Sequence, residues 1–191
     1  MLRTGRKWLV ASALAAFLAL PGICWGASFD YSSFNHEVGL RFGYGKNTQK
    51  ASVRLFSLLP SWGIFIVKPC QRWGVGLSFV VEGIISIADA EDTGFELGFT
   101  PMLKLHLPLG HAAKLFIEGG AGLITESINS PALAHAFNFT PQVGAGVDIA
   151  LMPKLGLTLA YRFRHSSNAG IYNENPAFNV NFFHAGLTYF Y

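Results

Sequence analysis

The chain has few charged residues and few cysteines. Only 13% of its 191 residues are charged, and its two cysteines are Cys24 and Cys70. Cys24 lies in an N-terminal segment that we expect to be removed, so the sequence predicts neither a disulfide framework nor a cysteine-based metal site. The histidines do not have the spacing of metal ligands either. We therefore expect no metal and no other cofactor.

Beyond its N-terminus the chain also lacks a long hydrophobic run, although 51% of its residues are hydrophobic. No uncharged apolar stretch after residue 26 reaches the roughly 18 residues that a membrane-spanning helix needs. A composition this apolar and this poor in charge is nevertheless unusual for a soluble domain. A transmembrane β-barrel explains both observations, because its apolar residues alternate with polar ones along each strand.

Residues 1–26 have the composition of a secretory signal peptide. Three cations precede an apolar stretch at residues 8–20, and Gly26 offers a small residue for cleavage. We predict a signal peptide over 1–26 and one barrel domain over 27–191. Cleavage would lower the number of Lys and Arg residues from 14 to 11, which equals the 11 Asp and Glu residues. The basic character of the whole chain therefore gives no reason to expect a nucleic-acid partner.

Hydrophobicity alternates with a period of two residues along the predicted mature chain. Between residues 95 and 107 every odd position is apolar, whereas Glu96, Thr100 and Lys104 occupy even positions. The segment 137–151 alternates in the same way. Alternation over this length exceeds an ordinary soluble strand and is typical of a tilted strand that crosses a membrane.

Eight segments show this alternation and predict an all-β fold, an eight-stranded antiparallel transmembrane β-barrel. The segments are 37–45, 51–66, 72–87, 95–107, 114–125, 137–151, 155–167 and 178–191. In the second segment the phase of the alternation slips between Leu55 and Pro60, so we predict a β-bulge there.

The connectors orient the predicted barrel, because short ones alternate with longer polar ones. In outer-membrane barrels the short turns face the periplasm and the longer loops face the exterior. A barrel of eight strands is filled by side chains, and we expect the charges of the inward phase to pair across it. These are Glu37, Arg41, Glu82, Glu96, Lys104, Glu118, Asp148, Arg162 and Arg164.

A base and a nucleophile lie together at the extracellular end of the seventh segment. His165 and Ser167 project from the same lipid-facing side of a strand with Cβ atoms about 6.5–7 Å apart, whereas Ser166 points inward. A serine nucleophile needs a base, usually a histidine that a third group orients. Asn179 and Asn181 continue the lipid-facing side of the last segment, and either amide is a candidate for that role. Polar residues in the headgroup zone also occur without catalysis.

The stretch from His165 to Gly170, His-Ser-Ser-Asn-Ala-Gly, resembles the C-terminal signature of the lipid A 3-O-deacylase family. Asn175-Pro176, residues 186–190 and the segments 116–123 and 137–144 resemble this family as well. The resemblance implies an eight-stranded barrel in the bacterial outer membrane that hydrolyses the ester-linked acyl chain at position 3 of lipid A, the membrane anchor of lipopolysaccharide.

Applied to this chain, the resemblance implies that His165 is the general base and Ser167 the nucleophile. It also implies that backbone amides near Asn168 and Gly170 stabilise the oxyanion. The family pattern places a glutamate twelve residues after the serine, where this chain has Asn179. An amide orients an imidazole but does not offset the imidazolium charge, so the departure predicts lower activity.

Several alternatives remain at this point. Glu174, in the predicted loop, is a second candidate partner for the histidine. A non-catalytic barrel with a structural or adhesive role, or an acyltransferase that moves an acyl chain of lipid A to an acceptor, would share the predicted fold and location. The sequence also leaves open whether the chain forms a homodimer and which acyl-chain length it accepts.

Overall fold

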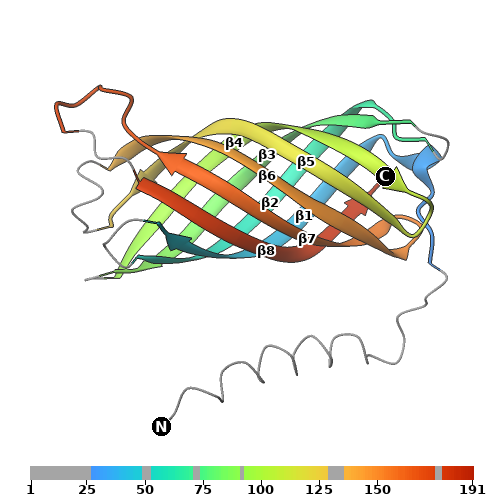
Figure 1. Ribbon diagram of the computed structural model, residues 1–191, viewed down its shortest axis with the longest axis horizontal. Coiled ribbons are helices and arrows are strands. Elements are labelled where there is room, and N and C mark those ends of the chain that lie inside the picture. Colours follow the sequence, from blue (N-terminus) through green and yellow to red (C-terminus); the bar gives the residue numbers. More distant parts are fainter. Residues whose placement is uncertain (1–26, 49–52, 71–73, 91–92, 129–135, 175–177) are drawn as a thin grey trace, which may run out of the picture.

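The computed structural model describes residues 27–48, 53–70, 74–90, 93–128, 136–174 and 178–191. They form a closed antiparallel barrel in which each strand pairs with its neighbours in the sequence and β8 returns to β1 (Figure 1). A short 3-10 helix, η1 (Tyr31–Ser33), precedes the strands. The strands are β1 (His36–Asn47), β2 (Arg54–Val67), β3 (Gly76–Asp89), β4 (Thr93–Leu109), β5 (Ala113–Glu126), β6 (Phe137–Met152), β7 (Leu155–Ser166) and β8 (Phe178–Phe190).

The predicted eight-stranded barrel is confirmed. The predicted signal peptide, residues 1–26, lies outside the described residues. Within those residues, the structure contains no helix that is long and apolar enough to span a bilayer.

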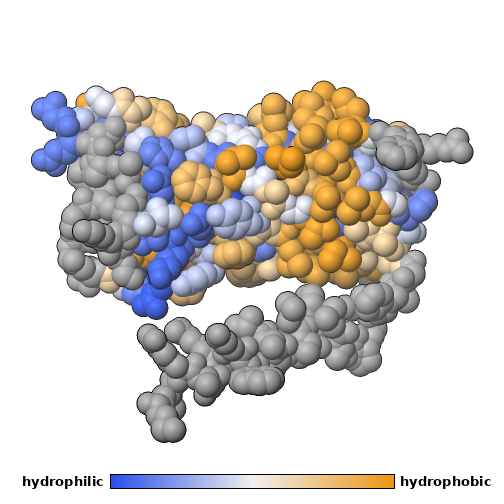
Figure 2. Space-filling model, viewed as in Figure 1, coloured by the Kyte–Doolittle hydropathy of each residue, from blue (hydrophilic) through white to orange (hydrophobic). Residues whose placement is uncertain are grey.

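Side chains alternate between the lumen and the outer surface along each strand. In β4, Phe99 and Leu103 are half exposed on the outside, whereas Thr100 and Lys104 are buried inside. Figure 2 shows the result on one face, where hydrophobic side chains cover most of the half that lies away from the β7–β8 loop. An exposed apolar surface of this extent requires lipid around it.

The predicted bulge between Leu55 and Pro60 is wrong. Over residues 54–64, β2 keeps one register with β1, and it pairs with β3 in the same register on both sides of Pro60. The irregularity lies instead at residues 65–67, where the register with β3 shifts. The apparent phase slip arises because Leu55 and Leu59 face the lumen and are buried in apolar clusters there.

Paired charges fill the centre of the lumen. Arg41 and Arg162 each form ion pairs with both Glu82 and Glu118. Arg41 Nη1 lies 3.1 Å from Glu118 Oε1, and Arg162 Nη1 lies 2.5 Å from Glu82 Oε1. All four side chains are buried, and an unpaired charge at this depth would be very costly.

Further ion pairs lie on either side of this central cluster. Toward the β7–β8 loop, Arg164 donates two hydrogen bonds of 2.5 and 3.0 Å to the carboxylate of Glu96. Toward the chain termini, the pairs are Lys104–Glu37 at 3.1 Å and Lys114–Asp148 at 2.5 Å. The prediction that the inward charges pair across the lumen is therefore confirmed.

The segment before β1 closes the periplasmic mouth of the barrel. Phe29, Tyr31 and Phe34 are buried there, and the ring of Phe34 stacks on that of Phe190 with centroids 4.3 Å apart. The hydroxyl of Tyr31 donates a hydrogen bond of 3.0 Å to the carbonyl of Gly110. Burial raises the pKa of Tyr31 to about 12, so this hydroxyl stays protonated as the donor.

Arginine substitutions on β4 test the lipid-facing side. Leu103 and Leu109 both face outward with similar exposure, 53% and 55%, but Leu109 is the last residue of the strand. We expect Leu103→Arg to lower the free energy of unfolding by about 2–4 kcal/mol and Leu109→Arg by about 1 kcal/mol or less, because the cost depends on depth. Urea titration in lipid vesicles measures both, and equal costs would contradict the assigned depths of the two residues in the membrane.

Arginine-to-glutamine substitutions test the charge cluster in the lumen. Arg162→Gln leaves Glu82 and Glu118 buried with one partner fewer, so we expect a loss of about 3–5 kcal/mol in the free energy of unfolding. The matched control is Arg54→Gln, because Arg54 pairs with Asp89 at 2.6 Å while both side chains are half exposed. That change should cost less than about 1 kcal/mol. Similar losses in both variants would show that burial does not set the cost.

Candidate active site

His165 and Asn179 face each other across β7 and β8. They are direct partners in the strand register, and the imidazole Nδ1 lies 2.7 Å from Asn179 Oδ1. Since an amide oxygen only accepts hydrogen bonds, Nδ1 is the donor, and Nε2 of the neutral ring keeps a lone pair for accepting a proton. The register thus brings Asn179 to the histidine. Asn181 instead accepts a hydrogen bond of 2.7 Å from the hydroxyl of Tyr161.

Ser167 directly follows the last residue of β7 and continues its alternation. It forms a bridge with Phe139 of β6, in which each backbone N–H donates to the other's carbonyl. The side chains of His165 and Ser167 are partly exposed on the outer face, whereas Ser166 is fully buried on the inner face. Among the described residues, the hydroxyl of Ser167 has no hydrogen-bond partner, and catalytic hydrogen bonds often form only when substrate is bound.

The chain turns sharply after Ser167. The N–H of Ile171 donates a hydrogen bond of 3.1 Å to the carbonyl of Asn168. The two residues between them have positive φ angles, 54° at Ala169 and 81° at Gly170, so this is a type I′ turn. Glycine adopts this conformation without strain, whereas an alanine in it is strained, and such strain gathers at functional sites.

The buried side chain of Asn168 braces this turn. Its Oδ1 accepts a hydrogen bond of 2.9 Å from the N–H of Gly170, and its Nδ2 donates one of 2.7 Å to the carbonyl of Glu174. The Gly170 amide is therefore already hydrogen-bonded, and its role toward an oxyanion stays a prediction that requires exchange of this bond. The side chain of Glu174 is exposed in the loop. The hydrogen bond of the imidazole is with Asn179.

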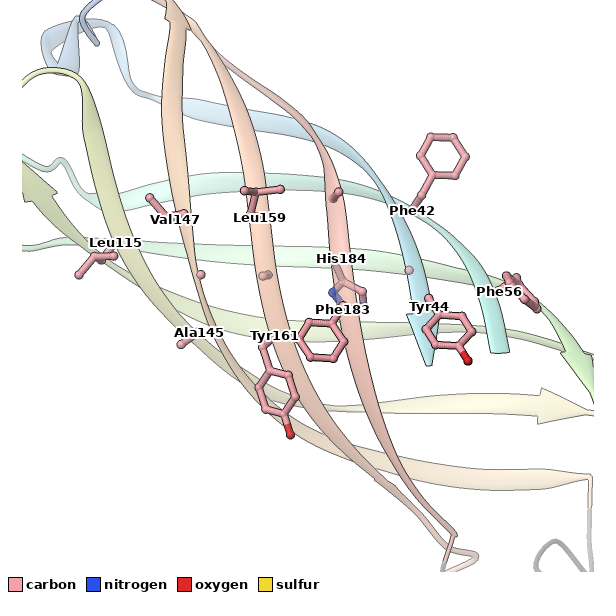
Figure 3. Close-up of a pocket in the computed structure, with 14 residues that line it drawn as sticks. Phe42, Tyr44, Phe56, Leu115, Ala145, Val147, Leu159, Tyr161, Phe183 and His184 are labelled. Atoms are coloured by element: carbon pink, nitrogen blue, oxygen red, sulfur yellow. The ribbon is translucent and has the colours of Figure 1, made fainter. Parts of the chain in front are cut away.

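An open apolar groove of about 900 Å³ lies on the outer surface on the periplasmic side of this pair (Figure 3). It is lined by residues of β1, β2, β5, β6, β7 and β8. Tyr161 and Phe183, whose ring centroids are 5.3 Å apart, belong to its lining. They lie on the strands of His165 and Asn179, four residues away along each. The small side chain of Ala185 helps to create the hollow between its larger neighbours.

The family model for the lipid A 3-O-deacylases (PagL) matches residues 61–188, which include β7, most of β8 and the turn between them. The chain belongs to the lipid A 3-O-deacylase family. Like this family, it is a carboxylic ester hydrolase of the bacterial outer membrane. The non-catalytic barrel and the acyltransferase considered from the sequence are therefore set aside.

Solved structures share the fold of this lipid A 3-O-deacylase family member. The crystal structure of the outer membrane enzyme PagL is 21% identical, covers 78% of this chain and 97% of its own, and has a TM-score of 0.65. Neisserial surface protein A is 14% identical, with coverages of 82% and 97% and a TM-score of 0.60. Ail, the attachment invasion locus protein of Yersinia pestis, is 12% identical, with the same coverages and a TM-score of 0.52. The comparison with curated protein sequences gives no match.

Two features of the site in this deacylase family member were not foreseen from the sequence. The brace formed by Asn168 has a weak local signal, since Asn followed by Ala-Gly is typical of a turn. The groove has none, because it forms where side chains from six strands leave a hollow.

Removing the Asn168 side chain should loosen the turn and leave the barrel intact. Asn168→Ala deletes both bracing hydrogen bonds, whereas Asn173→Ala changes an exposed asparagine of the same loop. We expect the Gly170 amide to exchange with deuterium about tenfold faster in Asn168→Ala, with strand amides unchanged. Exchange at Gly170 that is equally fast in both variants would contradict the brace.

Proposed function

We propose that this chain hydrolyses the 3-O-linked acyl chain of lipid A with Ser167 as nucleophile and His165 as general base. The hydrogen bond of 2.7 Å between His165 Nδ1 and Asn179 Oδ1 is the observation that carries the proposal. It orients the ring and leaves Nε2 as the basic nitrogen on the outer face that Ser167 shares. Cβ atoms about 6.5–7 Å apart allow the two side chains to meet when substrate is bound.

The reaction would proceed through an acyl-enzyme. Ser167 Oγ attacks the acyl carbonyl while Nε2 of His165 takes the hydroxyl proton. The tetrahedral intermediate then expels the 3-oxygen of the sugar, which receives that proton from the imidazolium. Next, Nε2 deprotonates a water molecule that attacks the acyl-serine. Collapse of the second intermediate releases the fatty acid, and the proton returns to Ser167.

Asn179 would act as a positioning residue in this mechanism. Its amide oxygen holds Nδ1–H in place and so keeps the tautomer that the base requires. It carries no charge, however, and gives less stabilisation to the imidazolium than a carboxylate would. We infer that the chemical step is slower here than it would be with a glutamate at this position.

Backbone amides around Asn168 and Gly170 are the proposed oxyanion donors. The Gly170 N–H would exchange its bond with Asn168 Oδ1 for one with the developing oxyanion. The turn can lose the hydrogen bond from Gly170 to Asn168 during the reaction, because its remaining hydrogen bonds hold it in place. Fixed donors at an oxyanion commonly contribute a factor of about 100 or more to the rate.

The surface around the site suits a lipid substrate of the outer leaflet. The ester would lie at the extracellular rim, and the acyl chain would extend over the apolar groove toward the middle of the membrane. The three proposed residues come from one chain, so the site does not need a partner subunit. Homodimerisation therefore remains a separate proposal.

Four substitutions test the assigned roles. Ser167→Ala and His165→Ala should each lower the rate of 3-O-acyl release by about 1,000-fold or more. Ser166→Ala is the matched control, because that side chain is buried in the lumen. Asn179→Ala should reduce the rate about 10- to 100-fold, and Asn179→Glu should preserve or raise it by restoring a charge partner. Mass spectrometry of lipid A incubated with each purified variant measures the release.

Heat-modifiable migration on gels checks that every variant has folded. Full activity of Ser167→Ala would exclude the assigned nucleophile. Loss of activity in Ser166→Ala, with Ser167→Ala still active, would exchange the roles of the two serines.

A further inference from the structure

Full charges on the outer surface of the strands gather next to the proposed active site. Among the strand residues that the structure describes, only Lys46, Arg54 and Asp89 carry a full charge and face outward. They lie at the extracellular ends of β1, β2 and β3, three neighbouring strands. Figure 2 shows hydrophilic side chains at the extracellular end of the face that carries β7 and β8.

This row of charges has one positive charge in excess. Lys46 and Arg54 are direct partners in the register of β1 and β2, and like charges in this position repel each other. Asp89 offsets Arg54 through the ion pair at 2.6 Å. Within the part of the chain that the structure describes, Lys46 has no acidic partner. An anion outside the protein would balance its charge.

Lys46 is separated from the proposed catalytic base by one strand. Its partner on β8 is Asn181, the next outward residue after Asn179. The backbone N–H of Thr48, just after β1, donates a hydrogen bond of 2.9 Å to the carbonyl of Asn179. Two strand spacings and two residues of rise place the Cα of Lys46 about 12 Å from that of His165.

The side of the site formed by β6 is apolar. β6 lies beside β7 there and presents Phe139, Pro141 and Val143 on its outer face. Charged side chains therefore border the site on the β8–β1–β2 side, whereas the β6 side is apolar. A substrate with an anionic headgroup and apolar chains has one favourable orientation on such a surface.

We propose that Lys46 binds a phosphate of the lipid A headgroup and thereby places the 3-O-acyl ester at Ser167. This inference rests on the proposed function. Lipid A is a phosphorylated glucosamine disaccharide in which a phosphate at position 1 and the acyl ester at position 3 belong to the same sugar ring. Four residues of rise instead of two place the Cα of Lys46 about 16 Å from that of Ser167. An extended lysine side chain, one sugar ring with its phosphate, and the serine side chain together span this separation.

The chemistry of the two groups matches. An ammonium group donates up to three hydrogen bonds, and such bonds to phosphate oxygens are strengthened by charge. At the membrane surface the effective dielectric constant is lower than in water, which strengthens the attraction further. Lys46 would act as a positioning residue for the substrate and would not touch the reacting atoms.

The test compares two substrates, lipid A with its 1-phosphate and lipid A without it, on the purified full chain in detergent. Lys46→Gln should raise KM about tenfold for the 1-phosphorylated form, with kcat unchanged, and leave KM for the other form unaltered. Lys46→Arg should behave as the wild type. Lys154→Gln is the matched control, because it removes an exposed lysine from the periplasmic turn between β6 and β7.

Equal effects of Lys46→Gln on both substrates, no effect, or a loss of kcat alone would overturn the inference. A wild type that deacylates neither substrate would instead overturn the proposed function. Binding of the two lipid A forms to the Ser167→Ala variant, measured by calorimetry, tests Lys46 without turnover. A preference for the 1-phosphorylated form that a further Lys46→Gln change removes supports the phosphate site, and the absence of that preference from Ser167→Ala excludes it.

Discussion

Closure of the barrel by backbone hydrogen bonds is the constraint on which the remaining structure depends. In a bilayer no water is available for an exposed N–H or carbonyl, so each strand must pair on both edges and β8 must return to β1. Once the sheet is closed, the register decides which side chains become neighbours. It places His165 opposite Asn179 and Lys46 opposite Asn181. The proposed base and the lysine proposed to bind phosphate therefore both pair with residues of β8.

The barrel reverses the usual distribution of charge in a protein. Its lumen contains one network of Arg41, Arg162, Glu82 and Glu118, in which each arginine forms ion pairs with both glutamates. Among the described strands, full charges on the outer surface occur only near the extracellular ends of β1–β3, and the polar His165, Asn179 and Asn181 of β7 and β8 lie beside them. Polar groups on a lipid-facing surface cost little only near the interface, and the proposed site lies at that depth.

Particular residues show how far sequence reasoning reached. Alternation correctly assigned the outward side of His165 and the inward side of Ser166, because both follow from a period of two. It failed at Leu55 and Leu59, where apolar side chains face the lumen and imitate a change of phase. It also left Asn179, Asn181 and Glu174 as competing partners, because pairing between strands depends on a register that hydrophobicity alone does not encode.

The sequence by itself determined the fold class, the lipid-facing and lumen-facing sides, and the family, because these follow from a local period and a short signature. Only the tertiary structure decided which amide contacts His165, how Asn168 holds the turn after Ser167, and where the apolar groove lies on the outer surface. Each of these depends on atoms from different strands or turns. Their positions are set jointly by register and barrel closure, which no single segment of the sequence specifies.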